Sequence, residues 1–129
     1  MTGQPVFDTL LLAIFGFALF TVVTLLFVDA PYGRHQRAGW GPSIPTRLGW
    51  VLMESPASLV FFFFYVTGDN ATSLPCLILL AMWQLHYFHR AFIYPFQIRV
   101  KPGSTTPLLV LLSGSTFCAI NGYLNGAYI

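Results

Sequence analysis

The stretch 74-LPCLILLAMWQLHYFHRAFIYP-95 combines a long apolar run with a cluster of polar side chains at its end. A run of this length is close to the ~20 residues that a helix needs to cross a bilayer. Its last ten residues nevertheless contain two histidines, one arginine and two tyrosines. Because ionisable groups at membrane depth are costly without partners, the stretch predicts a transmembrane helix that carries a functional site.

The composition of the whole chain is typical of a membrane protein. Of the 129 residues, 56% are hydrophobic and only 8% are charged, and the mean hydropathy is +0.70, which is far from the average of soluble domains. Four apolar windows have spanning length, namely 6–28, 48–66, 74–94 and 107–129. No Lys or Arg precedes the first window, which favours a retained span over a cleaved signal peptide. We therefore expect an all-α, polytopic transmembrane helix bundle with four spans and no nucleic-acid partner.

The distribution of basic residues predicts the orientation of the bundle. Loops 29–47 and 95–106 hold five of them, namely Arg34, Arg37, Arg47, Arg99 and Lys101. The middle loop, 67-TGDNATS-73, has none. By the positive-inside rule, the two basic loops are cytoplasmic and the N-terminus lies outside. We expect an integral membrane protein of a bacterial inner membrane, or of the endoplasmic reticulum in a eukaryote.

The same two loops are also rich in Gly and Pro. Such loops turn tightly and expose backbone N–H donors beside the cations. One interpretation is that the two loops together hold an anionic ligand. The other is that they anchor the chain to anionic lipid headgroups, as many juxtamembrane basic residues do.

One acid and one tyrosine are predicted at the same depth in the membrane. Glu54 is the only acid well inside a window, and it follows Arg47 by seven residues, or ~10 Å at 1.5 Å per residue. Tyr87 precedes Pro95 by eight residues, or ~12 Å from the same boundary. The two side chains can therefore meet if their helices are neighbours.

A proline next to Glu54 points to a cavity at that depth. Pro56 lies two residues after Glu54, and it cancels the helical hydrogen bond to the carbonyl of Leu52. We expect this helix to bend there. A bent helix with one carboxyl in lipid is typical of a cavity wall.

The polar residues at the end of the 74–94 window have two interpretations. Arg90 and Tyr94 are near enough to the boundary to extend to the headgroups as an interfacial belt. His86 and Tyr87 are too deep for this, and Glu54 is the acidic partner available to them at that level.

A phenol and a carboxyl side by side in an apolar pocket can both donate hydrogen bonds to one carbonyl oxygen. Such a pair stabilises the negative charge of an enolate that develops after nucleophile or hydride addition. Other catalytic sets fit less well, since both cysteines lie in predicted spans and three histidines are too few for a histidine-box di-iron site. We expect no metal.

Four motifs then carry a family resemblance: 31-PYGRH-35, 54-ESPAS-58, 85-LHYFHRAFIYP-95 and 114-GSTFCAINGYLNG-126. In this order and spacing they resemble the N-terminal half of the steroid 5α-reductases, in particular a bacterial member. The resemblance covers about 32–128. Polyprenol reductases and trans-2-enoyl-CoA reductases share parts of it.

The resemblance implies a seven-helix membrane fold that uses NADPH to reduce the Δ4 double bond of a 3-oxo steroid, with the hydride going to C5. It places the family's catalytic Tyr on Tyr87 and its Glu on Glu54, both in contact with the 3-oxo group. The substrate pocket maps onto Trp50, Met53 and Phe117. Cofactor-binding loops map onto Tyr32, Gly33, Arg34, Arg99 and Lys101.

Three departures from the family pattern alter these expectations. Met53 stands where the family commonly has Gln, which alters the hydrogen-bond support for the substrate, and Ser113 stands where animal members often have Arg, which leaves the polarity of the pocket and the exact steroid open. Family chains are about twice as long, and most of their NADPH contacts come from later helices. We therefore expect a missing C-terminal half as partner and no turnover by the 129 residues alone.

Two alternatives stay open. One is an enoyl-CoA or polyprenol reductase of the same superfamily, acting on another enone lipid. The other is a non-catalytic four-helix membrane subunit in which Glu54 relays protons and the basic loops bind membrane lipids.

Overall fold

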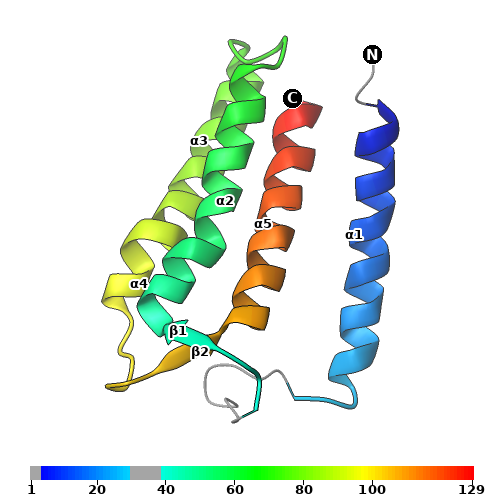
Figure 1. The fold of residues 1–129 in the computed structure, drawn as a ribbon. Coiled ribbons are helices and arrows are strands. Elements are labelled where there is room, and N and C mark those ends of the chain that lie inside the picture. The colour runs from blue at the N-terminus through cyan, green and yellow to red at the C-terminus, as the bar shows by residue number, and fades with distance from the viewer. Residues whose placement is uncertain (1–3, 30–38) are drawn as a thin grey trace.

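The computed structural model describes residues 4–29 and 39–129, and it is a bundle of long helices with a short strand pair at one end (Figure 1). In chain order the elements are α1 (Gln4–Leu25), β1 (Ser43–Pro45), α2 (Thr46–Val66), α3 (Leu74–Phe88), η2 (His89–Ile93), α4 (Tyr94–Gln97), β2 (Thr105–Pro107) and α5 (Leu108–Tyr128). Helices α1, α2 and α5 are long and apolar enough to cross a membrane. The expectation of an all-α, membrane-embedded bundle is confirmed.

The third expected span differs from the other three, because the structure divides it. Helix α3 has 15 residues and leads into η2, a π-helical turn in which the Tyr94 amide bonds to the His89 carbonyl. Pro95 follows at once, and it has no N–H to bond the carbonyl four residues back. The wider π turn accommodates this loss. Among the described helices, three and not four reach spanning length as a single α-helix, although α3, η2 and α4 together run the length of the bundle (Figure 1).

The core of the bundle is the contact between α2 and α5, which pack more extensively than any other pair in the described part of the chain. Helix α2 buries Ala57, Phe61 and Tyr65, which recur every four residues along one face. On α5, Gly122 and Gly126 lie against it, and a methyl group on Gly126 would meet the Phe61 carbonyl at 2.6 Å. Small residues spaced by four allow two helix backbones to approach closely, which is how membrane helices associate.

The close approach at Gly126 gives a stability prediction. We expect Gly126→Ala to destabilise the chain by about 1–3 kcal/mol, because its methyl group overlaps backbone that cannot move aside. Denaturant unfolding in detergent measures this. Gly16→Ala on α1 is the matched control, since nothing lies within 4 Å of its added methyl group. Equal unfolding midpoints for the two variants would contradict the proposed packing.

The hydrogen bond that Pro56 cancels is replaced from α5. Helix α2 continues through Pro56, and the freed carbonyl of Leu52 accepts a hydrogen bond of 3.1 Å from the Ser115 hydroxyl. Neighbouring Ser side chains commonly satisfy a backbone group that proline leaves free in a membrane helix. Pro56 thus helps to set where α5 lies on α2.

Two side chains of α3 fix that helix to α2. The Trp83 indole donates to the Ala57 carbonyl at 2.9 Å. The Gln84 amide donates to the Ser58 carbonyl at 3.0 Å and accepts from the Ser58 hydroxyl. Partly buried hydrogen bonds of this kind hold one helix face toward its neighbour and so set the direction in which the residues beyond it point.

The loops that precede α2 and α5 pair with each other. Strands β1 and β2 are antiparallel, with Ile44 opposite Thr106. The Thr46 amide also bonds to the Ser104 carbonyl at 3.0 Å. Helices α2 and α5 therefore begin side by side, each directly after a strand-ending proline. The start of α1 and the end of α5 lie at the opposite end of the bundle (Figure 1).

Helix α1 has no buried residue. It packs on α5, where the rings of Phe7 and Tyr123 lie 6.4 Å apart. Its outer surface is a continuous set of exposed apolar side chains, among them Leu12, Phe15 and Leu19. Such a surface suits a lipid environment.

Candidate functional site

Glu54 lies on the buried face of α2 and is 5% exposed. Its Oε1 accepts a hydrogen bond of 2.8 Å from the Nε of Arg90. Its Oε2 lies 3.9 Å from the thiol of Cys118 on α5. The acid that the sequence singled out is therefore held by groups from two other segments of the chain.

Arg90 comes from the π turn and contacts more than the carboxylate. Its guanidinium lies over the ring of Trp50, 5.2 Å from the centroid, a cation–π contact. Tyr94 meets the same ring edge-on at 5.5 Å. Arg90 and Tyr94 thus face α2, and the interfacial belt is the less fitting interpretation for them. His86 and Tyr87, expected as partners of Glu54, form no hydrogen bond with it among the described residues, and Arg90 takes that position.

Tyr87 lies on α3 between two other rings. The Trp83 ring is 4.6 Å and the His86 ring 4.9 Å from it. Its hydroxyl accepts a hydrogen bond of 3.2 Å from the side-chain amide of Asn121 on α5. The phenol is therefore fixed in position by contacts from both helices.

Glu54 and Tyr87 both line one cavity of about 510 Å³. Its lining comes from α1, α2, α3, η2 and α5: Phe17, Thr21, Met53, Glu54, His86, Tyr87, Arg90, Ser113, Gly114, Phe117 and Cys118. The volume is within the range of small-molecule sites, ~300–1,000 Å³. We call it the central cavity. It is a mainly apolar space into which a phenol, a carboxylate and a guanidinium converge, a combination that suits a lipid-like ligand with one polar oxygen.

A second cavity of about 400 Å³ adjoins the central cavity at the strand pair. It shares Met53, Arg90, Ser113 and Gly114 with the central cavity. Its other lining residues are Thr46, Trp50, Ser104, Thr105, Thr106 and Val110. Five hydroxyl side chains and the Arg90 guanidinium line this cavity near the first turns of α2 and α5, although the Thr46 and Ser104 hydroxyls bond each other and the Ser113 hydroxyl bonds the Val110 carbonyl. The guanidinium and the helix N-termini suit an anionic group.

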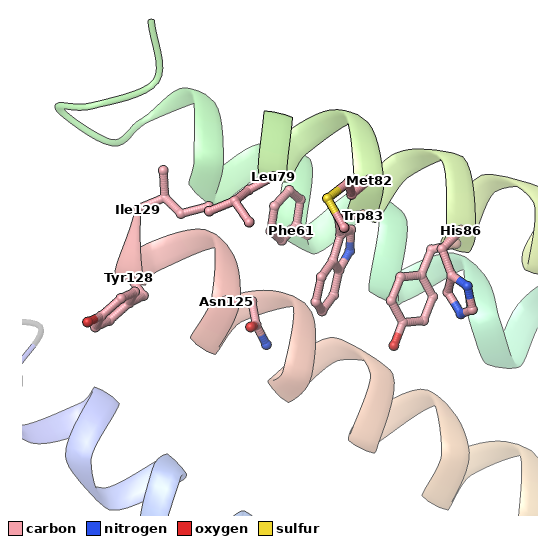
Figure 2. Close-up of a pocket in the computed structure, with 9 residues that line it drawn as sticks. Phe61, Leu79, Met82, Trp83, His86, Asn125, Tyr128 and Ile129 are labelled. Carbon is pink, nitrogen blue, oxygen red and sulfur yellow. The ribbon is translucent and has the colours of Figure 1, made fainter. Parts of the chain in front are cut away.

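A third space, of about 380 Å³, is a groove between α3 and α5 (Figure 2). Its walls are largely apolar, and Figure 2 shows Phe61, Met82 and Trp83 on one side and Asn125 of α5 on the other. His86 and Tyr87 line both this groove and the central cavity. A long ligand bound at Tyr87 can therefore extend its apolar body along the groove.

The predicted substrate and cofactor residues are distributed over these spaces. Met53 and Phe117 line the central cavity, whereas Trp50 lines the second cavity. Arg99 and Lys101 are exposed beyond the end of α4 and line none of the three spaces. Tyr32, Gly33 and Arg34 lie outside the described residues.

Three residues of the site escaped the sequence-based prediction: Arg90 as partner of Glu54, Cys118, and Asn121. The signal for Asn121 was present, since Asn121 and Asn125 are amides four residues apart within an apolar window, and polar residues facing inward in such helices mark functional positions. Within residues 4–29 and 39–129, no cluster of three His, Cys, Asp or Glu suited to a metal ion occurs.

Comparison with known proteins finds relatives of one kind, which are named as steroid reductases or steroid dehydrogenases. No protein-family model matches the chain. The chain is 35% identical over 130 residues to Steroid 5-alpha-reductase DET2 of Gossypium hirsutum, an alignment that covers 99% of this chain and 50% of the relative. It is 37% identical over 103 residues to the human 3-oxo-5-alpha-steroid 4-dehydrogenase 1, covering 78% of this chain and 39% of the relative.

A third relative extends the range of organisms. Steroid 5-alpha-reductase DET2 of Arabidopsis thaliana is 34% identical over 113 residues, which is 84% of this chain and 43% of the relative. The chain thus spans about half the length of the curated relatives that it matches, or less.

Proposed function

Because the chain belongs to the steroid 5α-reductase family, we propose that it forms the substrate-polarising half of a membrane enzyme that reduces the Δ4 double bond of 3-oxo steroids. The observation that supports this most directly is the central cavity, whose wall contains both Tyr87 and Glu54. Steroid reduction as the activity of the family follows from the names of the relatives. The particular bond, the residues and their roles are our proposal.

The proposed chemistry follows from the charge that develops in the reaction. NADPH, when bound, supplies the hydride, which adds to C5 of the enone. The electron pair of the C4=C5 bond then forms the enolate, with negative charge on the 3-oxygen, and C4 takes up a proton. Donors placed around that oxygen before the reaction lower the barrier, because they need no reorganisation when the charge appears.

Tyr87 and Glu54 are the proposed contacts to the 3-oxygen. The Tyr87 hydroxyl is a donor whose oxygen is already fixed by Asn121. Arg90 bonds Oε1 of Glu54, so we propose that Oε2 is the carboxyl oxygen that contacts the substrate, as the neutral acid and not as the ion pair formed without substrate. Met53 and Phe117 contribute apolar wall for the steroid body, and Trp50 holds Arg90 from the other side.

The cofactor is proposed to lie at the end of the bundle where the basic loops are. The Arg90 guanidinium in the second cavity is chemically suited to phosphate oxygens, and the Thr46 and Ser104 hydroxyls, which bond each other at 2.9 Å, lie beside it. The loop residues assigned to NADPH by family resemblance are Tyr32, Gly33, Arg34, Arg99 and Lys101. Further contacts would come from the second half of the family's fold, which we propose as the partner of this chain.

In the membrane, we propose that loops 29–47 and 95–106 face the cytoplasm and that the N-terminus lies outside. Five basic residues in these loops against none in 67–73 support this orientation. The proposed location is a bacterial inner membrane, or the endoplasmic reticulum in a eukaryote.

A paired assay tests the proposal against its alternatives. The protein that joins this chain to the second half of its fold is placed in lipid, and NADPH oxidation is followed with progesterone and, separately, with a long-chain enoyl thioester. We expect 5α-reduced steroid with progesterone. Conversion of the thioester alone would move the protein to a sister branch of the family. If neither substrate reacts, the non-catalytic membrane-subunit hypothesis replaces the proposal.

A further inference from the structure

Two asparagines of α5 form a hydrogen-bonded chain that ends on Tyr87. The side-chain amide of Asn125 donates to the Asn121 backbone carbonyl at 2.9 Å and to the Asn121 side-chain oxygen at 3.0 Å. The Asn121 amide in turn donates to the Tyr87 hydroxyl oxygen at 3.2 Å. The order of donors therefore runs from Asn125 through Asn121 to the phenol.

The direction of these hydrogen bonds decides whether the Tyr87 hydroxyl donates or accepts. An asparagine side chain has one accepting end and one donating end. Because Asn125 occupies the accepting end of Asn121, the donating end is turned toward Tyr87. The Tyr87 oxygen is thereby an acceptor, and among the described residues its own O–H donates to no group.

Asn125 is itself held by the helix. Residues four apart in an α-helix lie on the same face, so Asn125 can bond both to the backbone and to the side chain of Asn121 without help from another helix. In Figure 2 it lies on the α5 wall of the groove, opposite Trp83 and His86. A fixed Asn125 leaves Asn121 a single favourable orientation.

We propose that Asn121, oriented by Asn125, is a positioning residue that holds the Tyr87 oxygen as an acceptor and so reserves the phenol proton for the oxygen of the bound substrate. The inference rests on the proposed function, since it assigns a task to the donor that Tyr87 contributes. Hydrogen bonds in series also polarise one another, so the series from Asn125 through Asn121 makes the Tyr87 hydroxyl a stronger donor.

A simpler role for the two amides would be to join α3 to α5, as polar residues often do in membrane bundles. The two roles differ in what the direction of the bond must do. A joining role is served equally well by a side chain that accepts from Tyr87. The positioning role is not served by such a side chain, because Tyr87 would then donate its proton to that side chain and not to the substrate.

Asn121→Asp separates the two roles, because it keeps the size of the side chain and replaces its donor by an acceptor. In the protein that contains both halves of the fold, we expect kcat for progesterone to fall by roughly 10²-fold, approaching the loss expected when one oxyanion donor is removed, with KM changed less than about threefold. Asn121→Leu and Asn125→Ala, which remove the donor or free its orientation, should each lower kcat by about five- to tenfold, the equivalent of one ordinary hydrogen bond.

The same substitution in the Tyr87→Phe background provides the decisive comparison. There we expect Asn121→Asp to cause no further loss, because the proton that it diverts is absent. Asn70→Asp is the matched control, since the Asn70 amide bonds the Ile129 carbonyl just past the end of α5 and Asn70 lines none of the three spaces, so kcat should be unchanged. Circular dichroism and size exclusion establish that each variant is folded.

Each result separates the inference from the proposed function. If Tyr87→Phe reduces progesterone at the wild-type rate, the proposed function fails and the inference fails with it. If Tyr87→Phe is inactive while Asn121→Asp keeps its kcat, only the positioning role is refuted. Where Asn121→Asp does not fold, the kcat of Asn121→Leu and Asn125→Ala decides, and wild-type values there refute the role.

Discussion

Replacing Tyr87 with Phe is expected to lower kcat for a 3-oxo-Δ4 steroid by roughly 10²–10³-fold, the usual loss when one oxyanion donor is removed. The substitution deletes one oxygen and keeps the ring, so the contacts to Trp83 and His86 at 4.6 and 4.9 Å are retained. The loss should appear in kcat rather than in KM, because the enolate needs the donor more than the ground-state carbonyl does. Initial-rate kinetics of NADPH oxidation measure both constants.

A second tyrosine provides the control for this result. Tyr94 lies on α4, where its ring meets Trp50 edge-on at 5.5 Å, and it does not line the central cavity. Tyr94→Phe should therefore leave kcat within about twofold of wild type, which is under 0.5 kcal/mol on the transition-state scale. Equal losses in the two variants would show that a phenol oxygen matters for packing and not for polarising the substrate.

Replacing Arg90 with Leu is expected to destabilise the chain by about 3 kcal/mol, the lower end of the range for breaking a buried ion pair. The low end applies because the Arg90 side chain is 42% exposed while that of Glu54 is 6% exposed. Removal of the guanidinium leaves the carboxylate in an apolar site with a thiol at 3.9 Å, a poor substitute for a charged donor. Denaturant unfolding in detergent measures the loss.

A double replacement tests whether the unpaired Glu54 carboxylate causes this loss of stability. When Glu54→Leu and Arg90→Leu are combined, no unpaired charge remains, and replacing a whole buried pair by apolar groups is often neutral. We expect the double variant to recover most of the stability. Arg99→Leu, at an exposed position beyond α4, should change the free energy of unfolding little. A loss that persists in full in the Glu54→Leu background would mean that Arg90 acts through Trp50 instead.

Local sequence predicted the positions of the helices well. The windows 6–28, 48–66 and 107–129 correspond to α1, α2 and α5 with differences of a few residues at their ends. The free carbonyl of Leu52 also followed from Pro56 alone. Hydropathy and proline chemistry act over a few consecutive residues, so no knowledge of the rest of the chain was needed for them.

The depth argument brought Glu54 and Tyr87 to one level of the membrane, and the structure places both on the wall of one cavity. Their direct partners were not predictable in the same way. Each partner comes from another segment: Arg90 from the π turn for Glu54, and Asn121 from α5 for Tyr87. Which groups meet depends on how the helices are rotated and how closely they approach.

The sequence by itself determined that this chain is a membrane-embedded helical bundle, which ionisable groups lie inside it, and to which family it is related. The pairing of 43–45 with 105–107, the division of the third span at the π turn 89–93, and the donors on Glu54 and Tyr87 were decided by tertiary structure. The reason is physical. Hydropathy is a sum over neighbouring residues, whereas these contacts require backbones distant in sequence to approach, which Gly122 and Gly126 permit by packing α5 against α2.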